Sequence, residues 1–104
     1  MNTRSYKMKF DGVFNGKKAK FAARTSKIMR DVWNDDDDVW DHVTRWDTMA
    51  IADTIDDLFD AVHNDPALVD LVKRALLWFE DDNGNVVINR RKVRLRYKKM
   101  FGDF

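Results

Sequence analysis

The amino-acid sequence predicts an α+β fold in which three to four acidic amphipathic helices pack on one face of a small antiparallel sheet. Apolar residues alternate with polar ones near both ends of the chain, which is typical of half-buried strands. In the middle of the chain they recur at three- and four-residue spacing, which is typical of helices. Asn-Gly pairs in both terminal segments favour tight turns between strands. Terminal strands with helices between them indicate an α+β domain.

Length and composition predict one domain spanning residues 1–104. With 44% apolar residues, seven Phe and four Trp, the chain supplies a real core. The sequence contains no Cys, which excludes disulfides and thiolate chemistry and fits a reducing cytoplasm. No segment resembles a signal peptide, and no apolar run approaches the roughly 20 residues that span a membrane. We therefore expect a soluble, cytoplasmic protein.

The first expected element is an N-terminal β-hairpin. Apolar side chains alternate over residues 6–14 and again over residues 17–24, with Asn15-Gly16 between them. A two-residue turn there pairs Phe14 with Lys17 and brings the apolar side chains onto one face. The outer face is then basic.

The middle of the chain predicts three helical segments. Thr25 or Ser26 would cap a short helix ending at Asn34, with a break over residues 34–38. An apolar stripe over residues 39–46 and a second over residues 51–62 predict two further segments. The stripes are displaced around the helix axis, so the chain bends or restarts near Asp47-Thr48.

The last helix and a C-terminal β-hairpin complete the prediction. Asp65-Pro66 is a clear helix start, and the apolar stripe that follows extends the helix to Phe79. Asn83-Gly84 predicts a turn, and residues 86–88 read as a short strand. Residues 93–97 alternate apolar and basic side chains and predict a second strand, with residues 89–91 as the turn or a bulge between them.

The predicted core combines the apolar faces of these strands and helices. Its members are Phe10, Phe21, Ile55, Leu58, Phe59, Leu68, Val72, Leu76, Phe79, Val93, Leu95 and Tyr97.

Neither catalysis nor a cofactor is indicated. The chain has no nucleophile elbow, and its spacing of His42 and His63 from Asp residues matches no defined zinc site. Residues 81–86 faintly resemble a calcium loop, but the first and last ligand positions fall on Phe79 and Arg90. We therefore expect a protein without enzymatic activity, metal or other cofactor.

Charge is segregated along the chain. Residues 1–30 carry nine basic groups and one Asp (+8), residues 31–72 carry thirteen Asp and one Arg (−12), and residues 73–104 carry nine basic and four acidic groups (+5). Such blocks mark either interaction surfaces or solvated faces. The size, the absence of Cys and the many Trp and Asp are of a kind often seen in small phage-encoded proteins.

The acidic block leads to the first functional hypothesis, a non-catalytic protein-binding module. Carboxylates spread over helices imitate a nucleic-acid backbone, so the chain would act as an inhibitor or adaptor of a host or cellular protein with a basic nucleic-acid-binding groove, with Trp residues as anchors. The expected contacts are Asp35, Asp36, Asp37, Asp38, Asp41, Asp53, Asp56, Asp57, Asp60, Trp40 and Trp46.

The alternative hypothesis is direct nucleic-acid binding. If the two hairpins share a sheet, their outer faces form one wide basic surface that neutralises phosphates. Few aromatic residues interleave on this face, so stacking on single strands is not indicated. The residues of this surface are Lys7, Lys9, Lys18, Lys20, Arg24, Arg90, Arg91, Arg94 and Arg96.

Overall fold

The computed structural model describes the backbone of residues 2–6, 10–34 and 39–102, and the side chains of residues 10–26 and 46–102. The fold class is α+β, as predicted. The backbone forms two compact units, one comprising Met1–Met8 and Ser26–Asp47, the other Lys9–Thr25 and Thr48–Phe104. No helix in the described ranges has the length and apolar character needed to cross a membrane.

The described residues of the first unit lie in strands. β1 (Asn2–Tyr6) runs parallel to β5 (Val39–Ala52), with Asn2 opposite Asp41 and Tyr6 opposite Arg45. β5 is also the neighbour of β4 (Phe21–Asn34) in the sheet. Both long strands contribute residues to the second unit as well.

The predicted helices over residues 25–34 and 39–46 are therefore wrong. Both segments are rich in Thr, Val, Ile and Trp, which favour strands, and their Asp residues are poor helix formers. Their apolar spacing was compatible with either structure over so few residues. Pairing of β4 with β5, and of β5 with β1, satisfies backbone groups along these strands, which the apolar spacing of a single segment does not reveal.

The second unit holds the main sheet, in which the end of β5 and the start of β4 are followed by β6 (Leu77–Asp81) and β7 (Val86–Ile88). β4 and β6 are antiparallel, with Phe21 opposite Asp81 and Ala23 opposite Phe79. The strand over residues 86–88 and the Asn83-Gly84 turn are confirmed, since Gly84 has φ 81° and its N–H donates to the Asp81 carbonyl at 3.0 Å.

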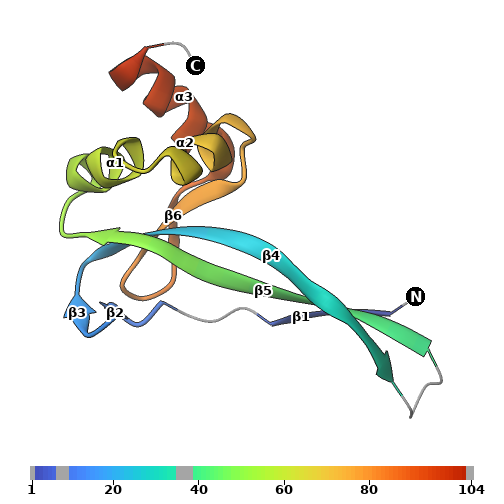
Figure 1. Cartoon of the computed structure of the whole chain (residues 1–104). Coiled ribbons are helices and arrows are strands. Elements are labelled where there is room, and N and C mark those ends of the chain that lie inside the picture. Colours follow the sequence, from blue (N-terminus) through green and yellow to red (C-terminus); the bar gives the residue numbers. More distant parts are fainter. Residues whose placement is uncertain (1, 7–9, 35–38, 103–104) are drawn as a thin grey trace. The chain divides into compact units, whose positions relative to one another are not determined.

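Three helices cover one face of this sheet (Figure 1). α1 (Ile55–His63) is capped by Thr54, whose hydroxyl accepts from the Asp57 N–H at 3.1 Å. α2 (Pro66–Lys73) starts where Asp65-Pro66 predicted, with the Asp65 carboxylate accepting from the Ala67 N–H at 3.0 Å. α3 (Arg90–Phe101) is the last element.

Two predictions for the C-terminal half are wrong. α2 ends at Lys73 because Ala75 takes a positive φ of 54°, and the apolar residues that follow enter β6 instead of extending the helix. Residues 93–97 belong to α3 and not to a strand. The spacing of Val93 and Tyr97 fits both a strand, with a period of two, and a helix, with i, i+4 contacts. Asn89 favours the helix because it is the N-cap: its side chain accepts a hydrogen bond from the Lys92 N–H at 2.9 Å.

The main core lies between the helices and the sheet. Phe59 of α1 and Phe79 of β6 meet edge to face with ring centroids 4.7 Å apart. Leu95 is 53% exposed, contrary to expectation, and Phe21, Ile55 and Leu76 are half-buried. The buried members are Ala23, Leu58, Phe59, Val62, Leu68, Val72, Leu77, Phe79, Ile88, Val93 and Tyr97.

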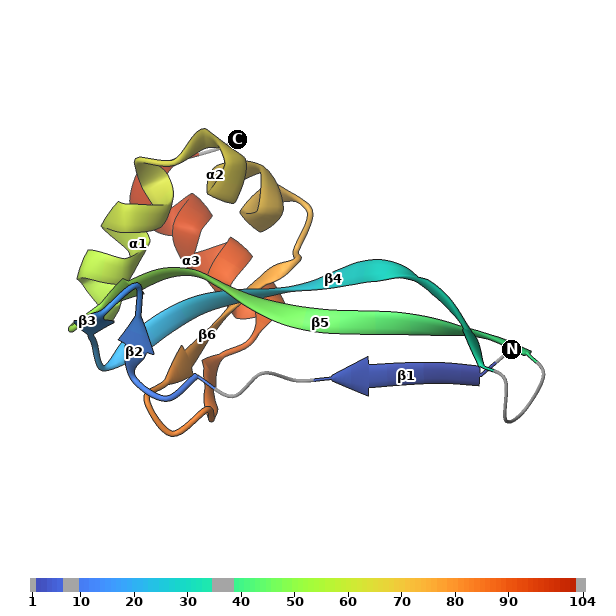
Figure 2. The same ribbon diagram turned by 60° about the horizontal axis from the view of Figure 1, so that its bottom comes forward.

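The hairpin of β2 (Val13–Phe14) and β3 (Lys17–Lys18) lies on the other side of the sheet from the helices (Figures 1 and 2). Phe14 lies opposite Lys17, as predicted, and Asn15 and Gly16 take the positive φ values that the turn requires, 50° and 77°. The hairpin is shorter than predicted because residues 21–23 pair with β6 instead. Lys7, Met8 and Lys9 lie outside the described residues.

Candidate functional site

Helix α3 carries the densest positive charge among the described elements. Its twelve residues, RRKVRLRYKKMF, include seven cations and no acid. Val93 and Tyr97 are buried against the rest of the unit. The Arg94 side chain donates from Nε to the Lys73 carbonyl at the end of α2, at 3.1 Å. These contacts determine which side of α3 faces solvent.

The side of α3 opposite the buried residues is a cationic surface with an apolar centre. At about 100° per residue, Leu95 points away from Val93 and Tyr97, and cations lie within one turn on both sides of it. We call this surface the α3 outer face; its residues are all exposed and are Arg91, Lys92, Leu95, Arg96 and Lys99.

The charges of the α3 outer face are not balanced locally. Within the described part of the chain, Arg91, Lys92, Arg96 and Lys99 form no ion pair with a carboxylate. Arg91 and Lys92 also lie in the first turn of the helix, where the macrodipole repels cations. An anionic partner would supply the carboxylates or phosphates that these cations lack within the described part of the chain.

Ring contacts hold Arg90, Arg96 of the α3 outer face, and the C-terminal end of α3. Arg90 lies over the Trp78 ring, 5.9 Å from its centroid, and Arg96 lies 5.5 Å from the centroid of Phe59. At the C-terminal end, Phe101 stacks on His63 of α1 with ring centroids 4.0 Å apart.

Tyr97 joins the same end of α3 to α1. Its hydroxyl lies 2.6 Å from Nδ1 of His63. Burial raises the pKa of the Tyr97 hydroxyl, so the neutral phenol is maintained. Together these contacts connect α3 to α1, while Arg94 connects it to α2, so the outer face is presented on a supported helix.

The predicted basic surface on the sheet is not observed. Lys18 and Lys20 are exposed near the β2–β3 hairpin, whereas Arg24 is only 1% exposed. Arg90, Arg91, Arg94 and Arg96 belong to α3 and not to a strand. Lys7 and Lys9 lie outside the described residues.

Arg24 belongs instead to a buried polar network. Its Nε lies 3.2 Å from Oε2 of Glu80, and its terminal nitrogen donates to the Thr48 hydroxyl at 3.0 Å. The same Glu80 oxygen accepts from Nε1 of Trp78 at 2.7 Å. A buried charge that is paired in this way serves the fold and is not available to a partner.

The predicted acidic surface is divided between elements. Asp53, Asp56, Asp57 and Asp60 are exposed in the second unit, the last three on one side of α1. Asp41, Trp40 and the half-buried Trp46 lie in β5, within the first unit. Asp35, Asp36, Asp37 and Asp38 lie outside the described residues. The prediction that the acidic surface lies entirely on helices is therefore wrong, because Trp40, Asp41 and Trp46 lie in a strand.

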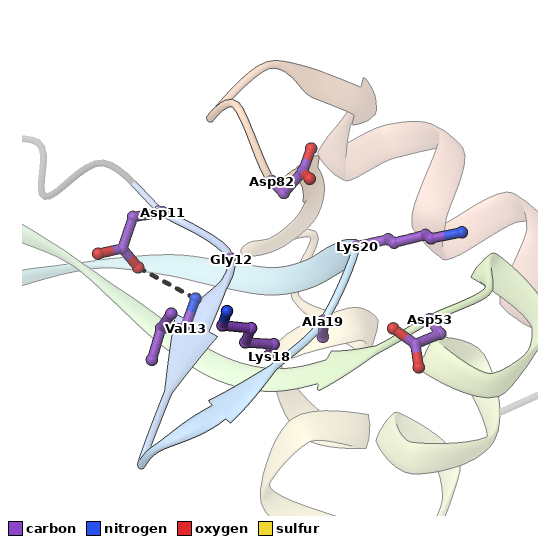
Figure 3. Close-up of a pocket in the computed structure, with 8 residues that line it drawn as sticks. All are labelled: Asp11, Gly12, Val13, Lys18, Ala19, Lys20, Asp53 and Asp82. Carbon is purple, nitrogen blue, oxygen red and sulfur yellow. Dashed lines mark hydrogen bonds between the residues drawn. The ribbon is translucent and has the colours of Figure 1, made fainter.

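A pocket of about 400 Å³ lies beside the β2–β3 hairpin (Figure 3). Its charged lining residues mix both signs, and the Asp11 carboxylate is engaged by the Val13 N–H at 3.0 Å. No group of three or more potential metal ligands occurs among the described residues. The pocket is lined by Asp11, Gly12, Val13, Lys18, Ala19, Lys20, Asp53 and Asp82.

Asp81 organises the adjacent β6–β7 turn. Its carboxylate accepts from the backbone N–H of Asn85 at 2.9 Å and of Asn83 at 3.0 Å. The Asn85 contact, followed by that of Asn83, lowers the pKa of Asp81. These carboxylate contacts stabilise the turn, and the loop does not resemble a cation site.

Comparisons with protein families, with curated proteins and with solved structures found no match. The cations of residues 90–99 were predicted to form part of a basic surface on a strand, and Leu95 was predicted to lie in the core. The i, i+4, i+8 spacing of Val93, Tyr97 and Phe101, together with Asn89 as a cap, is the signal that indicates the helix.

Proposed function

We propose that this protein binds nucleic acid through the α3 outer face. The observation that carries the proposal is a helix with seven cations and no acid, whose exposed side has no carboxylate partner among the described residues. Phosphates neutralised by Lys and Arg release counterions, which is the ordinary source of nucleic-acid affinity. The surface lies on a helix, and not on the sheet as expected from the sequence.

The acidic residues in the first turn of α1 stabilise their own helix, whereas the cations in the first turn of α3 do not. Asp56 and Asp57 occupy the first turn of α1, where the macrodipole stabilises carboxylates. The cations in the first turn of α3 have the opposite, unfavourable placement. This contrast favours nucleic-acid binding over the hypothesis of a protein inhibitor with an acidic surface.

Fluorescence anisotropy with labelled duplex DNA, single-stranded DNA and RNA at low salt tests the proposal. We expect binding to at least one of them, with log Kd rising linearly with log salt. Replacing Arg91, Lys92 and Lys99 with Ala should lower the slope by about 0.9 for each duplex phosphate that is no longer neutralised. If none of the three nucleic acids binds at low salt, the proposed function is wrong.

The matched control replaces Lys17, Lys18 and Lys20 with Ala. These residues are exposed and their replacement removes the same charge, but they belong to the β2–β3 hairpin region and not to α3. The control should retain most of the affinity and slope. Equal decreases in affinity in the two variants would show that net charge, and not the α3 outer face, determines binding.

A further inference from the structure

The α3 outer face has a feature that phosphate binding alone does not require, an exposed leucine at its centre. Leu95 is 53% exposed, although a leucine gains free energy from burial. Arg91 lies one turn before it and Lys99 one turn after it on the same side of the helix. An apolar side chain is therefore available in the middle of the cations.

The arrangement of charge around Leu95 is two-sided. Taking about 100° per residue, Arg91 lies to one side of Leu95, and Lys92, Arg96 and Lys99 lie to the other. A ligand with two parallel rows of negative charge and an apolar surface between them would satisfy all these groups. The major groove of DNA has this form, because phosphates line both edges and thymine methyl groups lie on its floor.

The size of α3 fits the same ligand. A helix is roughly 10–12 Å across with its side chains, and the major groove of B-form DNA is about 12 Å wide. The A-form RNA duplex has a deep, narrow major groove that excludes side chains. Single strands are bound through stacking on aromatic rings, and no Phe, Tyr or Trp is exposed among residues 10–26 and 46–102.

We propose that the partner is duplex DNA, and that α3 lies in its major groove with Leu95 against thymine methyl groups and the flanking cations on the two phosphate rows. This inference rests on the proposed nucleic-acid binding and names its substrate class.

The test compares four labelled probes of the same sequence by anisotropy: duplex DNA, the same duplex with deoxyuridine replacing thymidine, the single DNA strand, and the RNA duplex. Deoxyuridine removes only the C5 methyl group and preserves every hydrogen-bonding edge. We expect the thymidine duplex to bind most tightly, and the uridine duplex about fourfold more weakly for the removal of one buried methyl group.

Leu95→Ala identifies the residue responsible. The variant should bind the thymidine and uridine duplexes equally, with an unchanged salt slope because no charge is removed. Met100→Ala is the control, since Met100 is 42% exposed on the same helix but lies about 140° around it from Leu95. The control should retain the difference between the two duplexes.

Three results would overturn the inference while leaving nucleic-acid binding intact: equal or tighter binding of the single strand, equal or tighter binding of the RNA duplex, or no thymidine–uridine difference in the wild type. Binding of polyglutamate as tightly as the DNA duplex at the same salt would also overturn it, because any polyanion would then suffice. Absence of binding to all four nucleic-acid probes would instead contradict the proposed function itself.

Discussion

Arg24 and Glu80 form a buried ion pair on the face of the sheet away from the helices. The two side chains are 1% and 0% exposed and lie on the neighbouring strands β4 and β6. The desolvation of two such charges is offset only by close geometry and additional hydrogen bonds. Thr48 and Trp78 supply those bonds at 3.0 Å and 2.7 Å.

We predict that Glu80→Ala lowers the free energy of unfolding by about 3–5 kcal/mol, because it leaves the Arg24 guanidinium buried without its carboxylate. Urea denaturation followed by circular dichroism measures the change. A double variant, Arg24→Met with Glu80→Leu, removes both charges and should recover most of the stability. A cost below about 1 kcal/mol for Glu80→Ala would indicate that water reaches the pair.

Among the elements, the N-terminus of α3 is less well stabilised than that of α1, so the stability of α3 depends more strongly on its N-cap. The α1 N-terminus has Thr54 as a cap and two Asp in the first turn, whereas α3 has only the Asn89 cap against cations at the same positions. Lys and Arg have good helix propensity, but this does not offset the unfavourable interaction with the macrodipole in the first turn.

Asn89→Ala should therefore lower the free energy of unfolding by about 1 kcal/mol, because the Lys92 N–H loses its acceptor. Equilibrium urea unfolding is again the measurement. Asn89→Asp retains an acceptor and adds a negative charge at the positive end of the helix, so it should be at least as stable as the wild type. If Asn89→Ala were as stable as the wild type, tertiary contacts alone would maintain α3.

At the scale of the whole molecule, the second unit is a sheet with a different cover on each face. The three helices enclose the apolar core, and the β2–β3 hairpin lies on the other side of the sheet (Figure 1). Phe59 of α1 connects the helices to the sheet, since its ring contacts Phe79 of β6 and Arg96 of α3.

Phe59→Ala should cost about 3–5 kcal/mol of unfolding free energy, from reduced burial and the cavity left between α1 and the sheet. Val86→Ala is the control: Val86 is 51% exposed on β7, and its truncation should change stability by less than about 0.5 kcal/mol. The core assignment would be contradicted if the two variants had similar stabilities.

Features that depend on neighbouring residues are predictable from the sequence. Asn15-Gly16 requires a turn because of its backbone angles, Asp65-Pro66 starts a helix with a cap and a preset φ, and the amphipathic spacing of residues 55–62 indicates α1. The positive charge of residues 90–99 is equally visible in the sequence: Arg91 and Arg96 of the α3 outer face were predicted to bind nucleic acid, whereas Leu95 was predicted to be buried.

The segments whose apolar spacing fits both a helix and a strand depend on contacts with other elements. Residues 25–34 and 39–46 are strands because β4 and β5 are neighbours in the sheet and β5 also pairs with β1, and such pairing leaves little trace in the local spacing of either segment. Residues 93–97 alternate as a strand would, yet burial of Val93 and Tyr97 one helical turn apart directs Leu95 to the solvent and places it among the cations. The same charges would have formed a surface on a sheet had the backbone been extended. Because side-chain direction follows backbone conformation, the shape of the site depended on packing that no local pattern specifies.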